Sequence, residues 1–484
     1  MTSLAGRSAG GCRFNILALA GDLLPVCAEK VGIEHGQGFG INRGTCYTTG
    51  VSRAGAGQDH VQTVMAMNTY KSDFLNVLAT RGFIHQLSEP EALDALARSS
   101  TIAGYIGFDC TAPSLHVGSL LPIMMLYWMQ QTGHRPIALM GGGTTRVGDP
   151  SGKDESRRLL SDDDINQNLK GIRAIFSRFL RLGDRPGDRS GKDAVMANNA
   201  DWLNELNYID FLRDIGRHFS INRMLTFDSV KLRLERQQEL SFLEFNYMIL
   251  QAYDFVELYR RYGCVLQMGG SDQWGNIVSG IDLGRRMHNA QFFALTAPLI
   301  MTSSGAKMGK TASGAVWLNA DQVSAYEYWQ YWRNTDDADV ARFLKLFTVL
   351  PLDEIERLAE LKGAEVNEAK KVLATEATAL VHGRAAADEA AATARTTFEE
   401  GGLGAALPTT AVKNGESVVS VVTRIGFSSS NTQARQFVKD GAVYLGDVKI
   451  TDISTKIAPQ YFGQDRRSLL QVGKKRGIAT LESE

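Results

Sequence analysis

Short apolar runs alternate with longer segments of helical periodicity between Thr101 and about Ala320. Four of the runs have the length and composition of buried strands. They are Thr101–Ile106, Pro136–Met140, Ala194–Ala197 and Cys264–Met268. Helical segments follow, as at Leu115–Gln130 and from about Asp272, and glycines or asparagines often mark the turn between. An apolar strand, a Gly-rich turn and a helix form the pattern of a doubly wound parallel sheet, so we predict an α/β domain.

The pattern changes on both sides of this region. An amphipathic helix opens at Tyr70–Phe74, soon after Met67, and the chain after Ala320 is mainly helical and rich in alanine. Gly401–Gly404 then indicates a linker, which a small module follows. We therefore divide the chain into an α/β domain at 67–320, a helical domain at 321–400, a linker at 401–410 and a small α+β domain at 411–484.

The first 66 residues lack this order. They are rich in Gly, Ser and Thr, and their apolar stretch, Phe14–Ala20, is too short and too interrupted for a secretory signal. Three interpretations remain open: a targeting leader, a disordered tail, or residues added by an upstream start codon. Because a regular helix opens soon after Met67, we favour the last two, and we leave residues 1–66 unassigned.

Composition excludes several classes of protein. The 484 residues include 52 basic and 53 acidic side chains, so any contact with RNA must come from a local patch. No apolar run approaches the ~18 residues of a membrane helix, and we expect no membrane partner. The five cysteines are odd in number and contain no Cys-x-x-Cys pair. This argues against disulfides and structural zinc, and it fits a cytoplasmic protein.

The first polar cluster follows the first predicted strand, and ligands of such sheets bind where the strands end. Thr111 and His116 are hydrogen-bond donors there, and a helix beginning near Ser114 presents free N–H groups to an anion. Gly118 lets a phosphate or an adenine ring approach the backbone. Taken alone, a histidine beside a helix start favours a structural role.

Two further segments place cations near glycines. Lys153 and Arg157 follow Gly141–Gly143 and share one face if their segment is helical, where they can grip a polyphosphate. Lys307 and Lys310 lie in a loop rich in Gly and Ser, which we expect to be mobile. Each pair also fits an ordinary solvated surface.

A polar stripe marks a helix before the fourth strand. Tyr247, Gln251 and Asp254 share one face because they are spaced i, i+4 and i+7, and apolar residues fill the other faces. An unpaired buried polar group costs about 1–3 kcal/mol, so the stripe is either satisfied internally or faces a polar ligand. The apolar remainder favours the ligand. Asp272, after the fourth strand, is either an N-cap or an acceptor for a ribose hydroxyl.

Taken together and in this order, the segments resemble the catalytic domain of class I aminoacyl-tRNA synthetases, most closely the tyrosine-specific enzymes of bacteria and organelles. His116–Ser119 resembles the His-Ile-Gly-His signature, and Lys307–Thr311 resembles the Lys-Met-Ser-Lys-Ser loop. Leu250–Phe255 and Gly269–Asn276 are similar to segments specific to the tyrosine enzymes. The resemblance runs from roughly Tyr70 to the C-terminus. It implies a Rossmann-like catalytic domain, a helical domain and an S4-type RNA-binding domain.

The resemblance also implies a role for each matching position. Tyr105 and Asp254 would hold the substrate phenol hydroxyl. The substrate ammonium group would lie among Asp109, Thr144, Asp149, Asn199, Tyr247, Gln251 and Gln273. ATP would contact Gly118, Ser119, Gly270 and Asp272, with Thr111 and His116 facing its γ-phosphate. The departing pyrophosphate would be surrounded by Lys153, Arg157, Lys307 and Lys310.

The implied reaction has two steps. The carboxylate of L-tyrosine attacks the α-phosphorus of ATP, which gives tyrosyl-adenylate and pyrophosphate, and the 3′ end of tRNA(Tyr) then accepts the tyrosine. A carboxylate is already a nucleophile, so we expect catalysis by positioning and by stabilisation of charge on the phosphates. We assign no covalent nucleophile and no protein-ligated metal; Mg²⁺ would arrive with ATP.

Two alternatives remain open. One is the tryptophan enzyme, which shares the fold; Tyr105 together with Asp254 argues against it. The other is an RNA-binding or regulatory protein on an inactive synthetase core, and the four phosphate-side cations argue against that.

The C-terminal module has its own pattern. Ser428–Gly441 predicts a capped helix that ends at a glycine, and a hairpin follows at Ala442–Ile450. Arg435 and Lys439 share one face of that helix, and Lys449 follows in the hairpin. Residues from Asn431 onward include nine basic and six acidic side chains, a local excess of positive charge that suits phosphate contacts. A solvated helix and tail is the alternative, which we favour less because the module follows a synthetase-like core. A homodimer is implied by the family alone.

One position departs from the signature, because Ser119 stands where the second histidine is expected. Serine is shorter but still donates a hydrogen bond, so we predict an active enzyme with a weaker ribose or α-phosphate contact. Replacing Ser119 by histidine should therefore leave or raise the rate of tyrosine-dependent exchange of pyrophosphate into ATP. A tenfold loss in Ser119→His contradicts this interpretation. Gly309 and Thr311 replace the two serines of the loop signature, and we expect both to be tolerated because both lysines remain.

Overall fold

The computed structural model describes residues 70–150, 160–183, 191–303, 305, 308–311, 314–398, 404, 406–473 and 477–483. The N-terminal segment 1–66 lies outside the described residues, and so do Lys153, Arg157 and Lys307. Lys310 is described by its backbone alone.

The first domain is built on a six-stranded sheet with the order β1-β6-β5-β2-β3-β4. Its strands are β1 (Gln86–Leu87), β2 (Ala103–Phe108), β3 (Arg135–Met140), β4 (Val195–Asn198), β5 (Cys264–Gly270) and β6 (Phe293–Ala297). Neighbours are parallel except at the edge, where β1 pairs antiparallel with β6. The predicted α/β fold with a parallel sheet is confirmed, and the strand order reverses between β2 and β5, which is where such sheets bind ligands.

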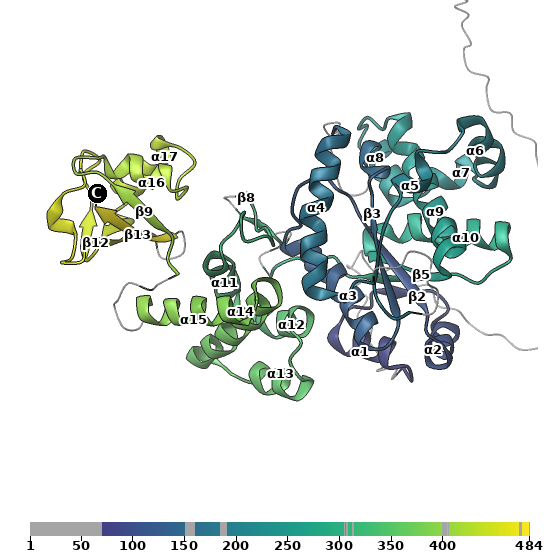
Figure 1. Ribbon diagram of the computed structural model, residues 1–484, viewed down its shortest axis with the longest axis horizontal. Coiled ribbons are helices and arrows are strands. Elements are labelled where there is room, and N and C mark those ends of the chain that lie inside the picture. Colours follow the sequence, from purple (N-terminus) through teal and green to yellow (C-terminus); the bar gives the residue numbers. More distant parts are fainter. Residues whose placement is uncertain are drawn as a thin grey trace, which may run out of the picture. The chain divides into compact units, whose positions relative to one another are not determined.

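Helices cover both faces of this sheet (Figure 1). They are α1 (Asp73–Arg81), α2 (Pro90–Ser99), α3 (Leu120–Gln131), α4 (Asp162–Phe179), α5 (Ala200–Leu203), α6 (Tyr208–Asp214), α7 (Ile221–Met224), α8 (Asp228–Glu235), α9 (Phe242–Tyr262) and α10 (Trp274–His288). Because successive strand residues point to opposite faces, Ile106 joins the core under α3 and α4, whereas Tyr105 joins the core under α9. The side chain of Tyr105 therefore lies on the face of the sheet that α9 covers.

The helix predicted from Leu115 begins later, which corrects the expectation of a helix start near Ser114. A 3₁₀ turn spans Val117–Ser119, and α3 begins at Leu120. The backbone before it is already engaged, because the N–H of Val117 donates to the carbonyl of Val316 at 2.9 Å and that of Leu318 donates to the carbonyl of Leu115 at 2.9 Å. Residues bonded to another strand-like segment cannot also form the first turn of a helix.

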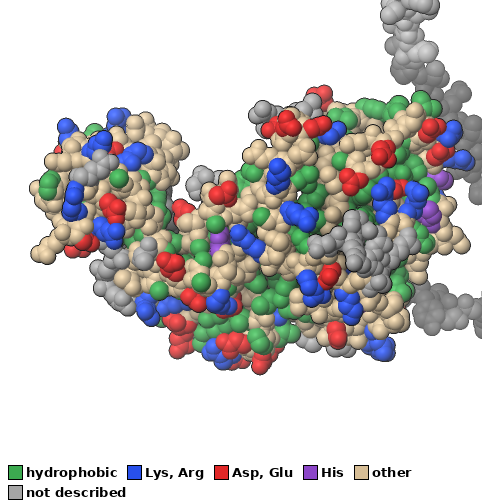
Figure 2. Space-filling model, in the orientation of Figure 1, with side chains coloured by type: hydrophobic (Ala, Val, Ile, Leu, Met, Phe, Trp, Pro, Cys, Tyr) green, Lys and Arg blue, Asp and Glu red, His purple; other side chains and the backbone are tan. Residues whose placement is uncertain are grey.

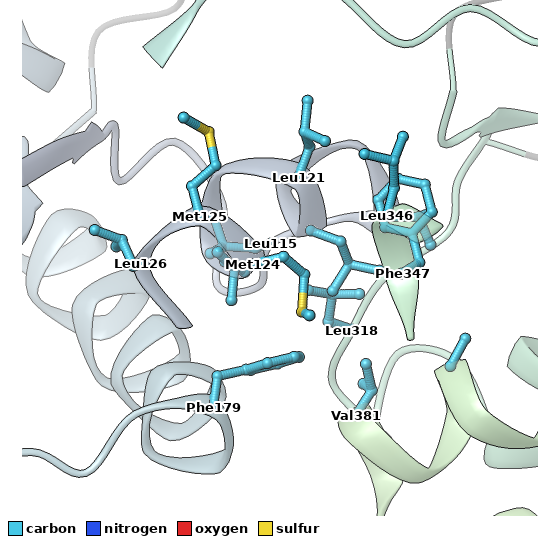
Figure 3. Packing of buried hydrophobic residues seen from close by; sticks show 14 of the residues in the cluster. Leu115, Leu121, Met124, Met125, Leu126, Phe179, Leu318, Leu346, Phe347 and Val381 are labelled. Carbon is cyan, nitrogen blue, oxygen red and sulfur yellow. The ribbon is translucent and has the colours of Figure 1, made fainter. Parts of the chain in front are cut away.

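The helical region after the sheet comprises α11 (Ala325–Arg333), α12 (Asp337–Phe347), α13 (Leu352–Ala359), α14 (Val366–His382) and α15 (Arg384–Phe398). It shares one hydrophobic core with the α3 side of the sheet. Figure 3 shows Met124 of α3 beside Leu318, on the side that faces Phe179 of α4 and Val381 of α14. The site segment that precedes α3 is therefore held from behind by a continuous apolar core.

The C-terminal module has a five-stranded sheet with the order β11-β10-β12-β13-β9. Its elements are β9 (Thr409–Val412), α16 (Val418–Arg424), α17 (Asn431–Lys439), β10 (Val443–Leu445), β11 (Val448–Ile450), β12 (Arg467–Val472) and β13 (Gly477–Ser483). The predicted capped helix and hairpin are both present, and Ser430 caps α17 by accepting from the N–H of Gln433. A short hairpin of β7 (Lys310–Thr311) and β8 (Gly314–Ala315) precedes the helical region. In the described part of the chain, no helix is both long and apolar enough to cross a membrane.

Candidate active site

A cavity of about 360 Å³ lies beyond the carboxyl ends of β2 and β5, at the reversal of strand order. Many of the predicted site residues line it: Tyr105, Asp109, Thr111, His116, Gly118, Ser119, Thr144, Asp149, Asn199, Tyr247, Gln251, Asp254, Gly270 and Gln273. Asp272 follows β5 and is not among the lining residues. Arg435, Lys439 and Lys449 belong to the C-terminal module, where all three are exposed.

The floor of the cavity pairs a hydroxyl with a carboxylate. Tyr105 is 1% exposed, and its Oη has no hydrogen-bond partner among the described residues. Asp254 is 2% exposed and accepts two hydrogen bonds, from Nδ2 of Asn199 at 2.9 Å and from Nε1 of Trp202 at 2.7 Å. Each carboxylate oxygen accepts one of these bonds and has two lone pairs, so each can accept from another donor.

Burial dominates the electrostatics of this floor. It raises the pKa of Asp254 to about 7, against the opposing effect of the hydrogen bonds from Asn199 and Trp202. Burial and the nearby charge of Asp254 also raise the pKa of Tyr105 well above its ordinary value. Tyr105 therefore stays a neutral hydroxyl, whereas Asp254 changes its charge near neutral pH.

A second polar group lies along the wall. The Oδ1 of Asp109 accepts from Oη of Tyr247 at 3.4 Å and from Oγ1 of Thr144 at 3.5 Å. Nε2 of Gln273 donates to Oδ2 of Asp149 at 2.9 Å. The carboxylates of Asp109 and Asp149 are thus held in place by hydrogen bonds from neutral side chains. They give this wall a negative charge that suits a cationic group.

The amide side chains along this wall are fixed by each other. Nε2 of Gln251 donates to Oε1 of Gln273 at 3.3 Å, and Nδ2 of Asn276 donates to Oε1 of Gln251 at 3.0 Å. The face shared by Tyr247, Gln251 and Asp254 does line the cavity, as the i, i+4, i+7 spacing predicts. A capping box at Ser241 opens α9 and Gly263, at φ 68°, ends it, which sets the position of that face.

The histidine segment packs against the lysine loop at the mouth. Nδ1 of His116 accepts from the N–H of Gly118 at 3.0 Å, which leaves the proton of a neutral imidazole on Nε2. Gly309 has φ 84°, and a Cβ built there would lie 2.9 Å from the N of Gly118 and 3.1 Å from Nδ1 of His116. Trp317 also lines the cavity and lies edge-on to His116.

Sequence reasoning missed several residues of this site. Trp202 is buried behind the floor, where it contacts Asp254, and Gln267 and Trp317 line the cavity. Nothing in the local pattern of Trp202 marks it, because its partner Asp254 lies on another helix. Asn276 had a usable signal, since it lies within the segment Gly269–Asn276. No group of three or more His, Cys, Asp or Glu side chains suited to a metal ion occurs among the described residues.

The parallel sheet and the cavity at the reversal of its strand order define an α/β domain with a ligand site at the ends of the strands. The family model described as "tRNA synthetases class I (W and Y)" matches residues 98–399, and the "Tyrosine--tRNA ligase SYY-like C-terminal domain" matches residues 399–478. This chain belongs to the class I tRNA synthetase family and, within it, to the tyrosine–tRNA ligases.

Similar proteins agree with this assignment. The tyrosine–tRNA ligase of Rhodopseudomonas palustris is 60% identical over 418 residues, which is 85% of this chain and 99% of the relative. That of Rhizobium meliloti is 60% identical over 417 residues, with the same coverage. A C-terminally truncated mitochondrial tyrosyl-tRNA synthetase of Aspergillus nidulans is similar in structure, with a TM-score of 0.60 and 31% identity over 68% of this chain and 95% of that one.

The contact of Gly309 with the histidine segment gives a test. Serine at this position, as in the loop signature, meets both an unfavourable φ and the N of Gly118. We expect Gly309→Ser to lower the turnover of pyrophosphate exchange about tenfold and to leave the tyrosine KM within twofold, because the floor is untouched. Thr311→Ser, which restores the other signature serine and keeps a hydroxyl, is the matched control and should remain within twofold. Full turnover in Gly309→Ser would refute the role of this contact.

Proposed function

We propose that this chain activates L-tyrosine with ATP and transfers the product to tRNA(Tyr), with the cavity residues in the roles given below. The observation that carries the proposal is the unpartnered hydroxyl of Tyr105 in the same cavity floor as the Asp254 carboxylate. A buried hydroxyl without a partner costs free energy, and a phenol hydroxyl bound there removes that cost. Phenylalanine offers no such group, so the pair favours tyrosine.

The ammonium group of tyrosine binds at the wall. Asp149, Tyr247 and Gln251 hold it, with Asp109, Thr144, Asn199 and Gln273 nearby. The hydrogen bonds of Gln273 to Asp149 and of Tyr247 to Asp109 support this arrangement, because they hold two carboxylates in place before the substrate arrives.

ATP binds at the mouth. Gly118, Ser119, Gly270 and Asp272 contact the nucleoside and α-phosphate, and Thr111 and His116 face the γ-phosphate. Lys153, Arg157, Lys307 and Lys310 neutralise the pyrophosphate as it leaves. The Nδ1 contact of His116 supports its role, since it directs the imidazole N–H of Nε2 away from its own backbone. Mg²⁺ carried by the ATP phosphates would supply further neutralisation of charge at the mouth.

The C-terminal module binds tRNA, through Arg435 and Lys439 on α17 and Lys449 on β11. Their exposure, together with the match of the tyrosine–tRNA ligase C-terminal model, supports this assignment. Figure 2 shows blue Lys and Arg side chains distributed over this module. A cytoplasmic location fits a chain whose described cysteines, Cys110 and Cys264, are free and buried.

Tyrosine-dependent exchange of pyrophosphate into ATP tests the activity. We expect exchange with tyrosine, none with phenylalanine or tryptophan, and loss on chelation of Mg²⁺. Tyr105→Phe should lower kcat/KM for tyrosine about tenfold, because one hydrogen bond to the phenol is lost, with the ATP KM unchanged. Exchange that depends on tryptophan would select the tryptophan enzyme. No exchange with any amino acid would refute the proposed activity. Charging of tRNA(Tyr) by the same preparation tests the second step.

We also propose that the chain forms a homodimer through the α6–α9 edge. Large apolar side chains are exposed there: Tyr208 at 58%, Ile209 at 67%, Ile221 at 60% and Phe242 at 69%. Figure 2 shows hydrophobic side chains gathered along this edge. Exposed apolar groups clustered over one region are typical of a protein interface, and a second copy presents the same edge.

Sedimentation velocity tests the dimer. Ile221→Glu should shift the wild-type dimer to monomer at micromolar concentration, because it places a charge in an apolar contact. Ile453→Glu in the C-terminal module, where the isoleucine is 39% exposed, is the control and should remain dimeric. A monomeric wild type at the same concentration would refute the proposal.

A further inference from the structure

A buried acid lies directly behind the cavity floor. Glu257 is 3% exposed and follows Asp254 by one turn of α9. It accepts from Oη of Tyr253 at 3.0 Å and from Nε of Arg261 at 3.0 Å, and it forms a close ion pair with Arg260. The side chains of Arg260 and Arg261 are 58% and 43% exposed, so this cluster extends from the solvent-exposed surface to the buried carboxylate of Glu257.

Arg261 also contacts the aromatic side chain behind the floor. The guanidinium carbon of Arg261 lies 5.1 Å from the centroid of the Trp202 ring, within the range of a cation–π contact. Trp202 is 3% exposed and donates its Nε1 proton to Oδ1 of Asp254 at 2.7 Å. A continuous chain of contacts therefore runs from Arg261 through the indole to the carboxylate.

Two physical effects follow from this chain. A cation over the indole face fixes the ring plane and withdraws electron density from it, which strengthens the N–H as a donor to a carboxylate. The same guanidinium neutralises Glu257, whose negative charge acts against that of Asp254 across one helical turn. Both effects favour the ionised carboxylate in the orientation that accepts a hydroxyl.

We propose that Arg261 is a positioning residue for the recognition of the substrate hydroxyl, acting through Trp202 on Asp254. The inference rests on the proposed tyrosine site and extends it to a side chain outside the cavity. Arg261 does not touch the substrate; it sets the orientation and charge of the group that does.

The proposal has a consequence for pH. The groups that bear on Asp254 are Tyr105 from β2, Asp109 after β2, Glu257 on its own helix, and the neutral donors Asn199 and Trp202. Since burial raises the pKa of Asp254 to about 7, tyrosine affinity should fall as the pH drops below that value. Loss of Arg261 leaves the charge of Glu257 less compensated and weakens the indole donor, so this fall should move to higher pH.

Steady-state pyrophosphate exchange between pH 6 and 9 tests the proposal, with wild type, Arg261→Met, Arg261→Lys and Arg260→Met. We expect Arg261→Met to raise the tyrosine KM about threefold to tenfold at pH 7, with the ATP KM and kcat within twofold, and to shift the pH profile of tyrosine KM upward. Arg261→Lys keeps the charge and should recover most of the affinity. Arg260→Met is the matched control: it removes the other ion-pair partner of Glu257 and so reports the charge effect, and its rise in tyrosine KM should be smaller than that of Arg261→Met.

The Trp202→Phe background provides the second arm. There, Arg261→Met should have a smaller effect than in the wild-type background, because the link through the indole is already broken and only the charge effect through Glu257 remains. Equal effects of Arg261→Met in both backgrounds, an unchanged pH profile, or an equal loss in Arg260→Met would overturn the proposal. Thermal unfolding of every variant separates a folding defect from a specific one. Absence of tyrosine-dependent exchange in the wild type would instead refute the proposed function itself.

Discussion

The burial of one carboxylate without a cationic partner governs the architecture around the cavity. Asp254 is 2% exposed and depends on neutral donors, Asn199 and Trp202. A buried charge is tolerated only when hydrogen bonds replace its hydration, so these donors must be held in place. Asn199 is fixed in turn, because its Oδ1 accepts from the N–H of Gly143 at 2.8 Å and its Nδ2 donates to Oγ1 of Thr144 at 3.0 Å. The loop after β3, the start of α5 and the middle of α9 are thereby linked through a single acid.

The choice of neutral donors also decides what the floor can recognise. An arginine beside Asp254 would occupy its lone pairs in a bidentate pair and leave little for a weak donor such as a phenol. Amide and indole N–H groups satisfy the carboxylate only in part. The hydroxyl of Tyr105 has no partner among the described residues. Its burial without a hydrogen bond costs free energy, and a substrate hydroxyl bound at the floor removes that cost. On our proposal, the preference for tyrosine over phenylalanine comes from the hydrogen-bond partner that Tyr105 lacks in the free site.

The sequence predicted the parallel sheet and the polar stripe of α9, because both depend on local periodicity. Strand positions were correct to within two residues at Pro136–Met140 and at Ala194–Ala197, whereas the helix expected from Leu115 starts at Leu120. That error has a non-local cause: residues 316–318 take up the backbone hydrogen bonds before α3. Trp202 escaped notice for the same reason, since its importance lies in a contact with another helix. Local patterns identify faces and turns, and they do not identify the partners that meet in space.

The helix α9 shows why the floor and the surface behind it cannot vary independently. Its cavity face carries Tyr247, Gln251 and Asp254, and the next turn carries Glu257. The helix has 21 residues between a capping box and a left-handed glycine, so both of its ends are fixed. A rotation that moved the cavity face would therefore also move Glu257. A buried Glu257 one turn from Asp254 would oppose ionisation of the floor if it stood alone, so the adjoining arginines are required by the same burial that makes the floor selective. Of these, Arg261 also contacts the indole that donates to Asp254. Its guanidinium therefore both neutralises Glu257 and supports the hydrogen bond to Asp254.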